Sequence, residues 1–212
     1  MILINVSKAI KYLPMSRNTN KNRQRYDILY DIAVSNNTNI DKIEIDFAIY
    51  LANILKLRVE HAIKTQKING IPMSAIFTKK GVNTITELSS KNDKAGTSMS
   101  KIYQKLSDSY NKSKNPINKD KFWTNTGELV KKLKVWKSSK GVNVGFPPNA
   151  RHTKSQYSKS RAKLDDIVKW MEYGTKKMPA RPLFTAVVSH ISKNIDVYFV
   201  HFIQLKGYKI NG

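Results

Sequence analysis

The sequence predicts an α+β fold, in which a small antiparallel sheet around a β-hairpin at residues 130–146 packs against long amphipathic helices near residues 43–66, 164–173 and 182–204. Two observations carry this prediction. Apolar residues recur every three or four positions in the helical segments, which is the period of an amphipathic helix. In the hairpin segment they alternate with polar residues on both sides of a turn that contains Gly, which is the pattern of two paired strands.

Residues 1–40 are predicted to form an extended, irregular N-terminal arm. The stretch 16–25 is basic, rich in Asn and has nothing to bury, and short apolar pieces at residues 2–6 and 26–34 flank it. Residues 41–212 are expected to form the α+β domain, with a long mobile insertion near residues 79–121 that is rich in Ser, Asn and Lys. The pattern favours one short helix inside this insertion, near residues 98–110.

The first long helix has a recognisable start and end. Asn39 or Asp41 can cap it, and Glu44 stands three residues after Asp41, as a capping box requires. Gly70 and Pro72 are expected to end it.

The second half of the chain alternates between strand and helix signals. Leu129–Trp136 and Val142–Phe146 are the two predicted strands. In the helix at 164–173, two Asp residues favour the start and Gly174 the stop. The last apolar stretch, 183–205, carries both helical and alternating patterns, but Pro182 at a first helical position favours a helix to at least Asn194.

The composition argues against most enzyme classes. The chain has no Cys, which excludes disulfides, thiol catalysis and thiolate metal sites, and its four His residues lack metal-binding spacing. No phosphate-binding Gly loop and no Gly-x-Ser-x-Gly turn occur. We therefore predict a non-enzymatic protein without catalytic, cofactor or metal sites. No run approaches the roughly 20 apolar residues of a membrane-spanning helix, and the N-terminus does not resemble a secretory signal.

The positive charge is the strongest compositional feature. Lys and Arg total 38 against 15 acidic residues, which gives a formal net charge of +23. Such an excess favours polyanionic partners, although it also serves solubility alone. A nucleic-acid interpretation assigns phosphate contacts to Lys131, Lys132, Lys134, Lys137 and Lys140, with Trp123 and Trp136 nearby for base stacking.

The order of motifs resembles one family. The chain contains Thr126-Gly127-Glu128-Leu129, a hairpin ending Val142-Asn143-Val144-Gly145, the step Glu172-Tyr173-Gly174-Thr175 and then Ala180-Arg181-Pro182-Leu183-Phe184 before a last helix. In this order the chain resembles, over residues 122–205, the tail-completion or head–tail joining (neck) proteins of tailed bacteriophages. It departs from the family pattern at Leu183, which separates Arg181-Pro182 from Phe184, and in its very basic loop at 149–161.

The resemblance implies a structural virion protein, assembled in the host cytoplasm, that joins the head connector to the tail. Such proteins form rings of identical copies, commonly sixfold, and contact the head connector or adaptor and tail-terminator or tail-tube proteins. A tail-terminator role is a variant of the same interpretation, and the ring surrounds the passing DNA. A basic nucleic-acid-binding protein is the alternative, and no membrane partner is expected.

The candidate site is the elbow before the last helix. Gly174 permits a sharp helix end, Thr175 can bond freed backbone groups, and Pro179 and Pro182 direct the chain into the helix that starts near Phe184. Arg181 is expected to form a forked ion pair with Glu172. These residues either orient the last helix for a neighbouring subunit or brace the subunit's own fold.

Overall fold

The chain forms an α+β fold of two compact units in a computed structural model that describes residues 4–5, 28–73, 112, 114–119, 121–124, 126–139, 141–153, 162–175 and 180–209. Unit 1 comprises Met1–Ile2, Leu55–Lys134 and Gly145–His190. Unit 2 comprises Leu3–Ile54, Val135–Val144 and Ile191–Gly212. The α+β class predicted from the sequence is confirmed.

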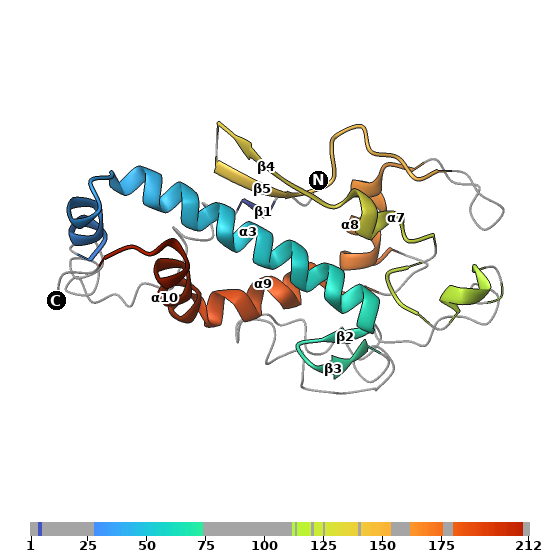
Figure 1. Ribbon diagram of the computed structural model, residues 1–212. Coiled ribbons are helices and arrows are strands. Elements are labelled where there is room, and N and C mark those ends of the chain that lie inside the picture. Colours follow the sequence, from blue (N-terminus) through green and yellow to red (C-terminus); the bar gives the residue numbers. More distant parts are fainter. Residues whose placement is uncertain are drawn as a thin grey trace. The chain divides into compact units, whose positions relative to one another are not determined.

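Helix α3 (Ile40–Thr65) is the longest described element and contributes to both units, which divide after Ile54 (Figure 1). Its start is capped by Asn39, whose side-chain oxygen accepts a hydrogen bond from the Lys42 backbone N–H at 2.7 Å. Such a cap satisfies one of the N–H groups that have no partner inside the helix. The predicted helix and one of its two predicted caps are therefore confirmed.

A three-stranded sheet has the strand order β1-β5-β4, with β1 at Ile4–Asn5, β4 at Lys134–Ser138 and β5 at Gly141–Gly145. The central strand β5 pairs antiparallel with β1, which places Ile4 opposite Val144. Val144 is fully buried. The predicted hairpin is confirmed as β4–β5, and β1 pairs with it from the segment predicted to be an irregular arm.

The predicted first strand begins too early in the sequence. Residues from Leu129 onward were expected to be extended, but Glu128–Lys132 form helix α7, and the strand starts only at Lys134. The reason lies in spacing: the Glu128 carboxylate and the Lys132 ammonium stand four residues apart and lie at 3.2 Å, a pairing that stabilises a helical turn. Gly127, with φ of 78°, gives the chain its turn into that helix.

Residues 28–35, predicted to belong to the irregular arm, are helical. The apolar residues of the piece at 26–34 explain this helix. Leu29, Ile32 and Ala33 recur at helical spacing and are all buried, which gives the segment a core-facing stripe.

The core of unit 2 is an aromatic cluster between the first half of α3 and helix α10 (Ile195–Lys206) (Figure 1). The Phe47 ring meets the Phe199 ring edge-on at a centroid distance of 5.1 Å and the Phe202 ring at 5.2 Å. Offset and edge-to-face contacts of this kind stabilise a core beyond the area they bury. Phe202 is fully buried.

Unit 1 contains helix α8 (Leu164–Tyr173) and the first part of α9 (Phe184–Lys193), whose inner residues Leu164, Val168 and Val187 are buried. The helix predicted at 164–173 is confirmed. The predicted last helix at 182–204 is two helices, α9 and α10, which are separated at Asn194. Pro182 precedes the first of them by two residues and is not its first residue.

A second, tight hairpin follows α3 and was not predicted. Lys67–Ile68 (β2) pairs antiparallel with Ile71–Pro72 (β3). Between them Asn69 and Gly70 have φ values of 49° and 86°. Both central residues have positive φ in the turn type that suits the twist of a two-residue hairpin, and Asn-Gly is its preferred sequence.

Part of the predicted insertion is described, including the short 3₁₀ helix η1 (Pro116–Asn118). The predicted helix near 98–110 and residues 154–161 of the basic loop lie outside the described residues. Within the part of the chain that the structure describes, no helix is both long enough and apolar enough to cross a membrane.

Candidate functional site

Two of the motifs that carry the family resemblance, Glu172–Thr175 and Ala180–Phe184, lie between α8 and the start of α9 in unit 1, and we call this part of the chain the elbow (Figure 1). Helix α8 ends at Tyr173, and Gly174 follows with φ of 75° and ψ of 179°. This backbone conformation is almost restricted to Gly, so the predicted role of Gly174 in ending the helix has a physical basis here. Pro179 lies outside the described residues.

Glu172 forms the centre of the elbow. Its side chain is only 2% exposed, and both carboxylate oxygens accept hydrogen bonds from backbone N–H groups at the start of α9. Oε2 accepts from Leu183 at 2.9 Å and from Phe184 at 3.1 Å, and Oε1 accepts from Thr185 at 2.7 Å. The carboxylate of one helix thus caps the next, where N–H groups lack partners and negative charge is favourable. We call this arrangement the Glu172 cap.

Two opposing effects act on the pKa of Glu172. Burial disfavours the charged form and raises the pKa above its ordinary value of 4.5. The hydrogen bonds from Thr185, Leu183 and Phe184 favour the charged form and partly offset this rise. The pKa of Glu172 is raised overall, because desolvation is the larger effect.

Arg181 is 5% exposed and is fixed through its backbone as well as its side chain. Its N–H donates to the Met171 carbonyl at 2.6 Å, and its own carbonyl accepts from the Trp123 indole Nε1 at 2.9 Å. The guanidinium carbon lies 5.6 Å from the centre of the Phe122 ring, within the range of a cation–π contact. Arg181 therefore links α8 to the segment around Trp123.

The predicted ion pair between Glu172 and Arg181 is wrong. Among the ion pairs of the described residues, none joins these two side chains. The physical reason is competition: the Glu172 oxygens face three backbone donors, which are nearer in the fold than the guanidinium group.

The other predicted elbow residues divide between core and surface. Phe184 is buried, and its ring meets the Trp123 ring edge-on at 5.9 Å. Pro182 is half-buried, and Thr175 is exposed. The burial of Glu172 and Arg181 favours the fold-bracing interpretation for these two residues, because a neighbouring subunit cannot reach side chains that are 2% and 5% exposed.

Two exposed aromatic residues beside the elbow were missed by the sequence argument. Trp170 is 45% exposed and Tyr173 is 69% exposed, and they stand three residues apart on α8, on one face of the helix. Trp and Tyr are the residues most enriched at the energetic centres of protein interfaces. Their spacing relative to the buried residues Leu164 and Val168 was the signal that places them on the outer face.

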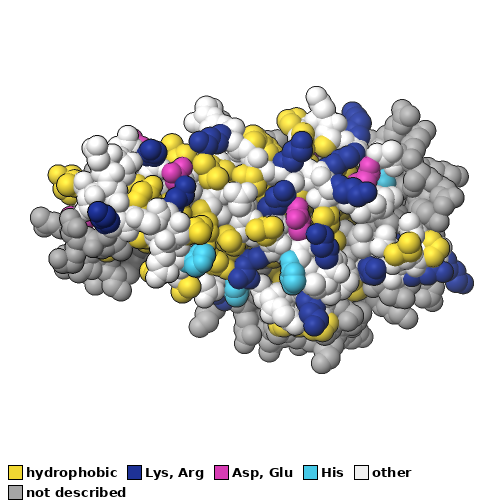
Figure 2. All heavy atoms as spheres, in the orientation of Figure 1, with side chains coloured by type: hydrophobic (Ala, Val, Ile, Leu, Met, Phe, Trp, Pro, Cys, Tyr) yellow, Lys and Arg dark blue, Asp and Glu magenta, His cyan; other side chains and the backbone are white. Residues whose placement is uncertain are grey.

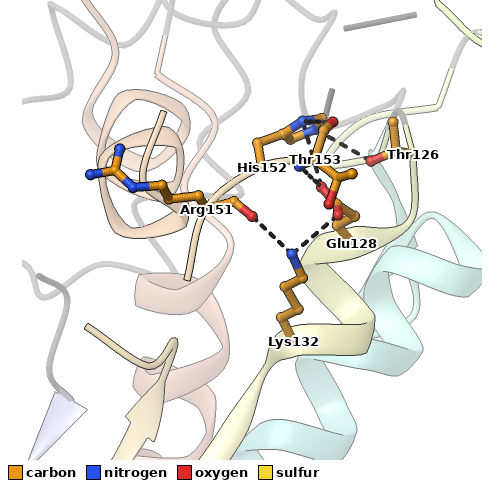
Figure 3. Close-up of polar contacts among 6 residues, drawn as sticks. All are labelled: Thr126, Glu128, Lys132, Arg151, His152 and Thr153. Carbon is orange, nitrogen blue, oxygen red and sulfur yellow. Dashed lines mark hydrogen bonds and ion pairs between the residues drawn. The ribbon is translucent and has the colours of Figure 1, made fainter. Parts of the chain in front are cut away.

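A polar cluster around Glu128 joins α7 to the segment at 151–153, as Figure 3 shows. The Glu128 carboxylate contacts the Lys132 ammonium at 3.2 Å and the His152 Nδ1 at 3.5 Å, and it accepts the Thr153 N–H at 2.8 Å. The Thr126 hydroxyl lies 3.3 Å from His152 Nε2.

This cluster holds the segment at 151–153 against α7. The His152 Nδ1 also lies 2.9 Å from the Thr153 carbonyl, so the imidazole is bonded to the loop backbone. Burial alone would raise the pKa of Glu128, but the hydrogen bonds from Thr153 and Lys132 and the charge of His152 hold it below its usual value of 4.5. The ionised carboxylate therefore fastens the loop to the helix.

The lysines predicted to contact nucleic acid differ in exposure, in bonding and in the unit to which they belong. Lys131 and Lys134 are exposed in unit 1 and Lys137 is exposed in unit 2. Lys132 is bonded to Glu128 and to the Arg151 carbonyl at 2.8 Å. Lys140 lies outside the described residues. Figure 2 shows basic side chains among hydrophobic ones on the face in view, where acidic side chains are sparse.

Trp123 cannot serve as a base-stacking residue, because it is 1% exposed and its indole is bonded to the Arg181 carbonyl. Trp136 is half-buried on β4. Within the described ranges, no three His, Asp or Glu side chains are grouped so as to hold a metal ion.

Comparison of the chain with protein-family models, with curated proteins and with solved structures finds no match in any of the three.

Proposed function

We propose that this chain is a non-enzymatic structural subunit of a tailed-bacteriophage neck, a tail-completion protein that joins the head connector to the tail as a ring of identical copies. The proposal rests on the order of motifs given above, with its Thr-Gly start, hairpin, Glu-Tyr-Gly-Thr step and Ala-Arg-Pro elbow. The observed order of α7, β4–β5, α8, elbow and α9 is compatible with it.

The Glu172 cap is the structural observation that supports the proposal. It gives a physical reason why a Glu must stand at the end of one helix and an elbow of fixed length must follow it: the carboxylate has to reach Leu183, Phe184 and Thr185. A subunit of a closed ring needs a fixed angle between its surfaces, because a small error repeats at each contact and prevents closure. The cap fixes the direction in which α9 leaves α8.

The exposed aromatic pair beside the elbow supports an assembly role. Trp170 and Tyr173 lie on the helix that the cap holds, and they offer rigid apolar surface to a neighbouring protein. Replacing both residues with Ser in the full chain should leave its unfolding temperature within about 2 °C, since exposed positions contribute little to stability.

The proposal is tested by deleting the gene for this chain from the phage genome that encodes it and examining the particles by electron microscopy. We expect DNA-filled heads and separate tails that do not join, and recovery of joined particles when the chain is supplied from a plasmid. Complete, infectious particles without the chain would refute the proposal.

Nucleic-acid binding is the second candidate, and a specific observation favours it. In the described part of unit 1, fifteen Lys and Arg residues stand against five acids, Glu60, Glu128, Asp165, Asp166 and Glu172. A basic excess is one requirement of a polyanion-binding surface, to which Lys114 and Arg181 do not contribute because they are buried. The same surface would serve a neck ring through which DNA passes.

The mass of the purified chain with short duplex DNA, measured across a salt series, distinguishes the two candidates. A discrete complex that persists at physiological salt supports nucleic-acid binding as the function itself. Weak binding that disappears steeply with salt supports the structural role, because non-specific phosphate contacts release counterions.

A further inference from the structure

The two sides of the basic loop meet in unit 1 as a short antiparallel bridge, which pairs Arg151 with Lys163. Two backbone hydrogen bonds flank this pair, donated by the His152 N–H at 3.0 Å and by the Leu164 N–H at 2.9 Å. Neither bond joins Arg151 to Lys163 directly. The two residues therefore form a non-hydrogen-bonded pair, which is the register in which opposite side chains lie closest together.

Both residues of the bridge are basic, and both are exposed. Side chains that stand directly opposite each other share one face, with their Cβ atoms about 5 Å apart, and like charges in this position destabilise the pairing. Solubility requires surface charge but does not require two like charges in one register. The fold thus gains no stability from this arrangement, and we call Arg151 and Lys163 the cation pair.

The backbone that carries Arg151 is held on both sides. The Lys132 ammonium donates to the Arg151 carbonyl at 2.8 Å, and the Glu128 carboxylate accepts the Thr153 N–H at 2.8 Å, as Figure 3 shows. A side chain on a fixed backbone loses less conformational freedom when it binds a ligand. The Glu128 cluster therefore prepares Arg151 for binding.

The Glu128 carboxylate does not serve the Arg151 side chain. It contacts Lys132, His152 and the Thr153 N–H. Figure 3 shows the Arg151 side chain extending away from this carboxylate. The acid that stands closest to Arg151 in the cluster is thus directed at other groups.

The sequence around the cation pair keeps an excess of positive charge. Residues 150–170 contain six Lys and Arg residues against two acids, Asp165 and Asp166. Both acids lie in the first turn of α8, where negative charge stabilises the helix. The charge of Asp165 acts on Lys169 as well as on Lys163, so it offsets only part of the charge of Lys163. The cation pair is therefore suited to an anionic ligand.

We propose that the cation pair binds one phosphate group of a nucleic-acid backbone. The Arg151 guanidinium can donate to two phosphate oxygens, and the Lys163 ammonium adds a compact charge to the same group. A nucleic acid fits better than an acidic protein, because duplex DNA presents one charge in about every 1.7 Å of its axis to a chain with a net charge of +23. The inference rests on nucleic-acid binding, the second candidate function, and does not require the neck role.

The test is fluorescence anisotropy of a short labelled DNA duplex, titrated with the full chain across a salt series. The double variant Arg151→Gln, Lys163→Gln removes the cation pair. The double variant Lys64→Gln, Lys67→Gln is the matched control, because both of these lysines are exposed in unit 1 and the change in net charge is the same. Circular dichroism shows whether both variants are folded.

We expect loss of the cation pair to weaken binding at least about tenfold, because hydrogen bonds to a charged group are removed. The slope of log affinity against log salt should fall by about 1, the value for one phosphate contact. The loss should be equal for duplexes of unrelated sequence, since phosphate contacts carry no sequence information. The control should bind within about threefold of the wild-type chain. The unfolding temperature should not fall when the cation pair is removed, because repulsion between like charges is relieved.

Four results would overturn the inference. If both double variants bind alike, the phosphate contact lies elsewhere, while nucleic-acid binding still stands. If the wild-type chain binds no duplex even at low salt, nucleic-acid binding fails as well. If poly-glutamate displaces the duplex equally well per charge, the cation pair binds carboxylates of an acidic protein. A clear fall in the unfolding temperature would show that the pair serves the fold. The gene-deletion experiment decides the neck role separately from all four.

Discussion

The Glu172 cap gives the sharpest prediction, through the substitution Glu172→Gln. The Gln side chain has nearly the same shape but only one acceptor oxygen, whereas the carboxylate accepts from Leu183 and Phe184 through Oε2 and from Thr185 through Oε1. The best placement of Gln keeps the two bonds at Oε2. Its amide N–H₂ then faces the Thr185 N–H. Because both groups are donors, the hydrogen bond from Thr185 is lost.

The magnitude follows from the one bond that must be lost. A hydrogen bond to a charged group contributes about 1.5–3 kcal/mol, so Glu172→Gln should lower the free energy of unfolding by about that amount. For a chain of this size the unfolding temperature should fall by about 3–10 °C. Denaturant and thermal unfolding, followed by tryptophan fluorescence, measure both quantities.

Glu60→Gln is the matched control, since it makes the same chemical change in unit 1. Glu60 forms a surface pair with Lys56 at 3.7 Å on α3, four residues apart. Such pairs contribute about 0.3–0.5 kcal/mol. A loss at Glu172 no larger than the loss at Glu60 would refute the capping role.

The pH dependence of the same variant tests the direction of the pKa shift. Because the pKa of Glu172 is raised in the folded chain, the folded state holds more protons than the unfolded state between the ordinary value of 4.5 and the raised value. The stability of the wild-type chain relative to Glu172→Gln should therefore fall as the pH rises through that window. A rise would mean that the three N–H donors outweigh the desolvation of the carboxylate.

Three further predictions concern other contacts. Trp123→Phe removes the bond from the indole Nε1 to the Arg181 carbonyl and should cost about 1 kcal/mol in denaturant unfolding, whereas no loss would show that this bond does not fix the elbow. Glu128→Gln should speed amide hydrogen exchange at Thr153, and unchanged exchange would contradict the loop-holding role. Because the pKa of Glu128 is lowered in the folded chain, the stabilisation that its carboxylate gives the wild-type chain should be lost as the pH falls below about 4.5. If unit 1 contacts DNA, Lys134→Glu should weaken binding and reduce its salt dependence, and unchanged binding would exclude this exposed lysine from the contact.

Local signals in the sequence predicted much of the fold. The Asn39 cap, the alternation across Val142 and Val144 and the helix stop at Gly174 each depend on neighbouring residues alone, and all three occur in the structure. The Asn69-Gly70 turn carried an equally local signal, which was missed because Gly70 was interpreted only as part of the end of the preceding helix.

Contacts between residues that are distant in the sequence were harder to predict. Opposite charge suggested that Glu172 pairs with Arg181, but the carboxylate is directed at the start of α9, and sequence alone does not show that direction. Likewise, the nucleic-acid interpretation offered Trp123 for base stacking because it lies near the hairpin lysines in the sequence, yet it is a core residue. Spacing of apolar residues along α8 would have placed Trp170 on the outside.

The measurement that tests the central claim most directly is the position of the chain in purified phage particles, determined by gold labelling of a tagged full-length chain and electron microscopy. The proposed function predicts label at the junction between head and tail in joined particles, and none along the tail tube. Particles that are fully assembled but carry no label, or label confined to another part of the particle, would contradict it.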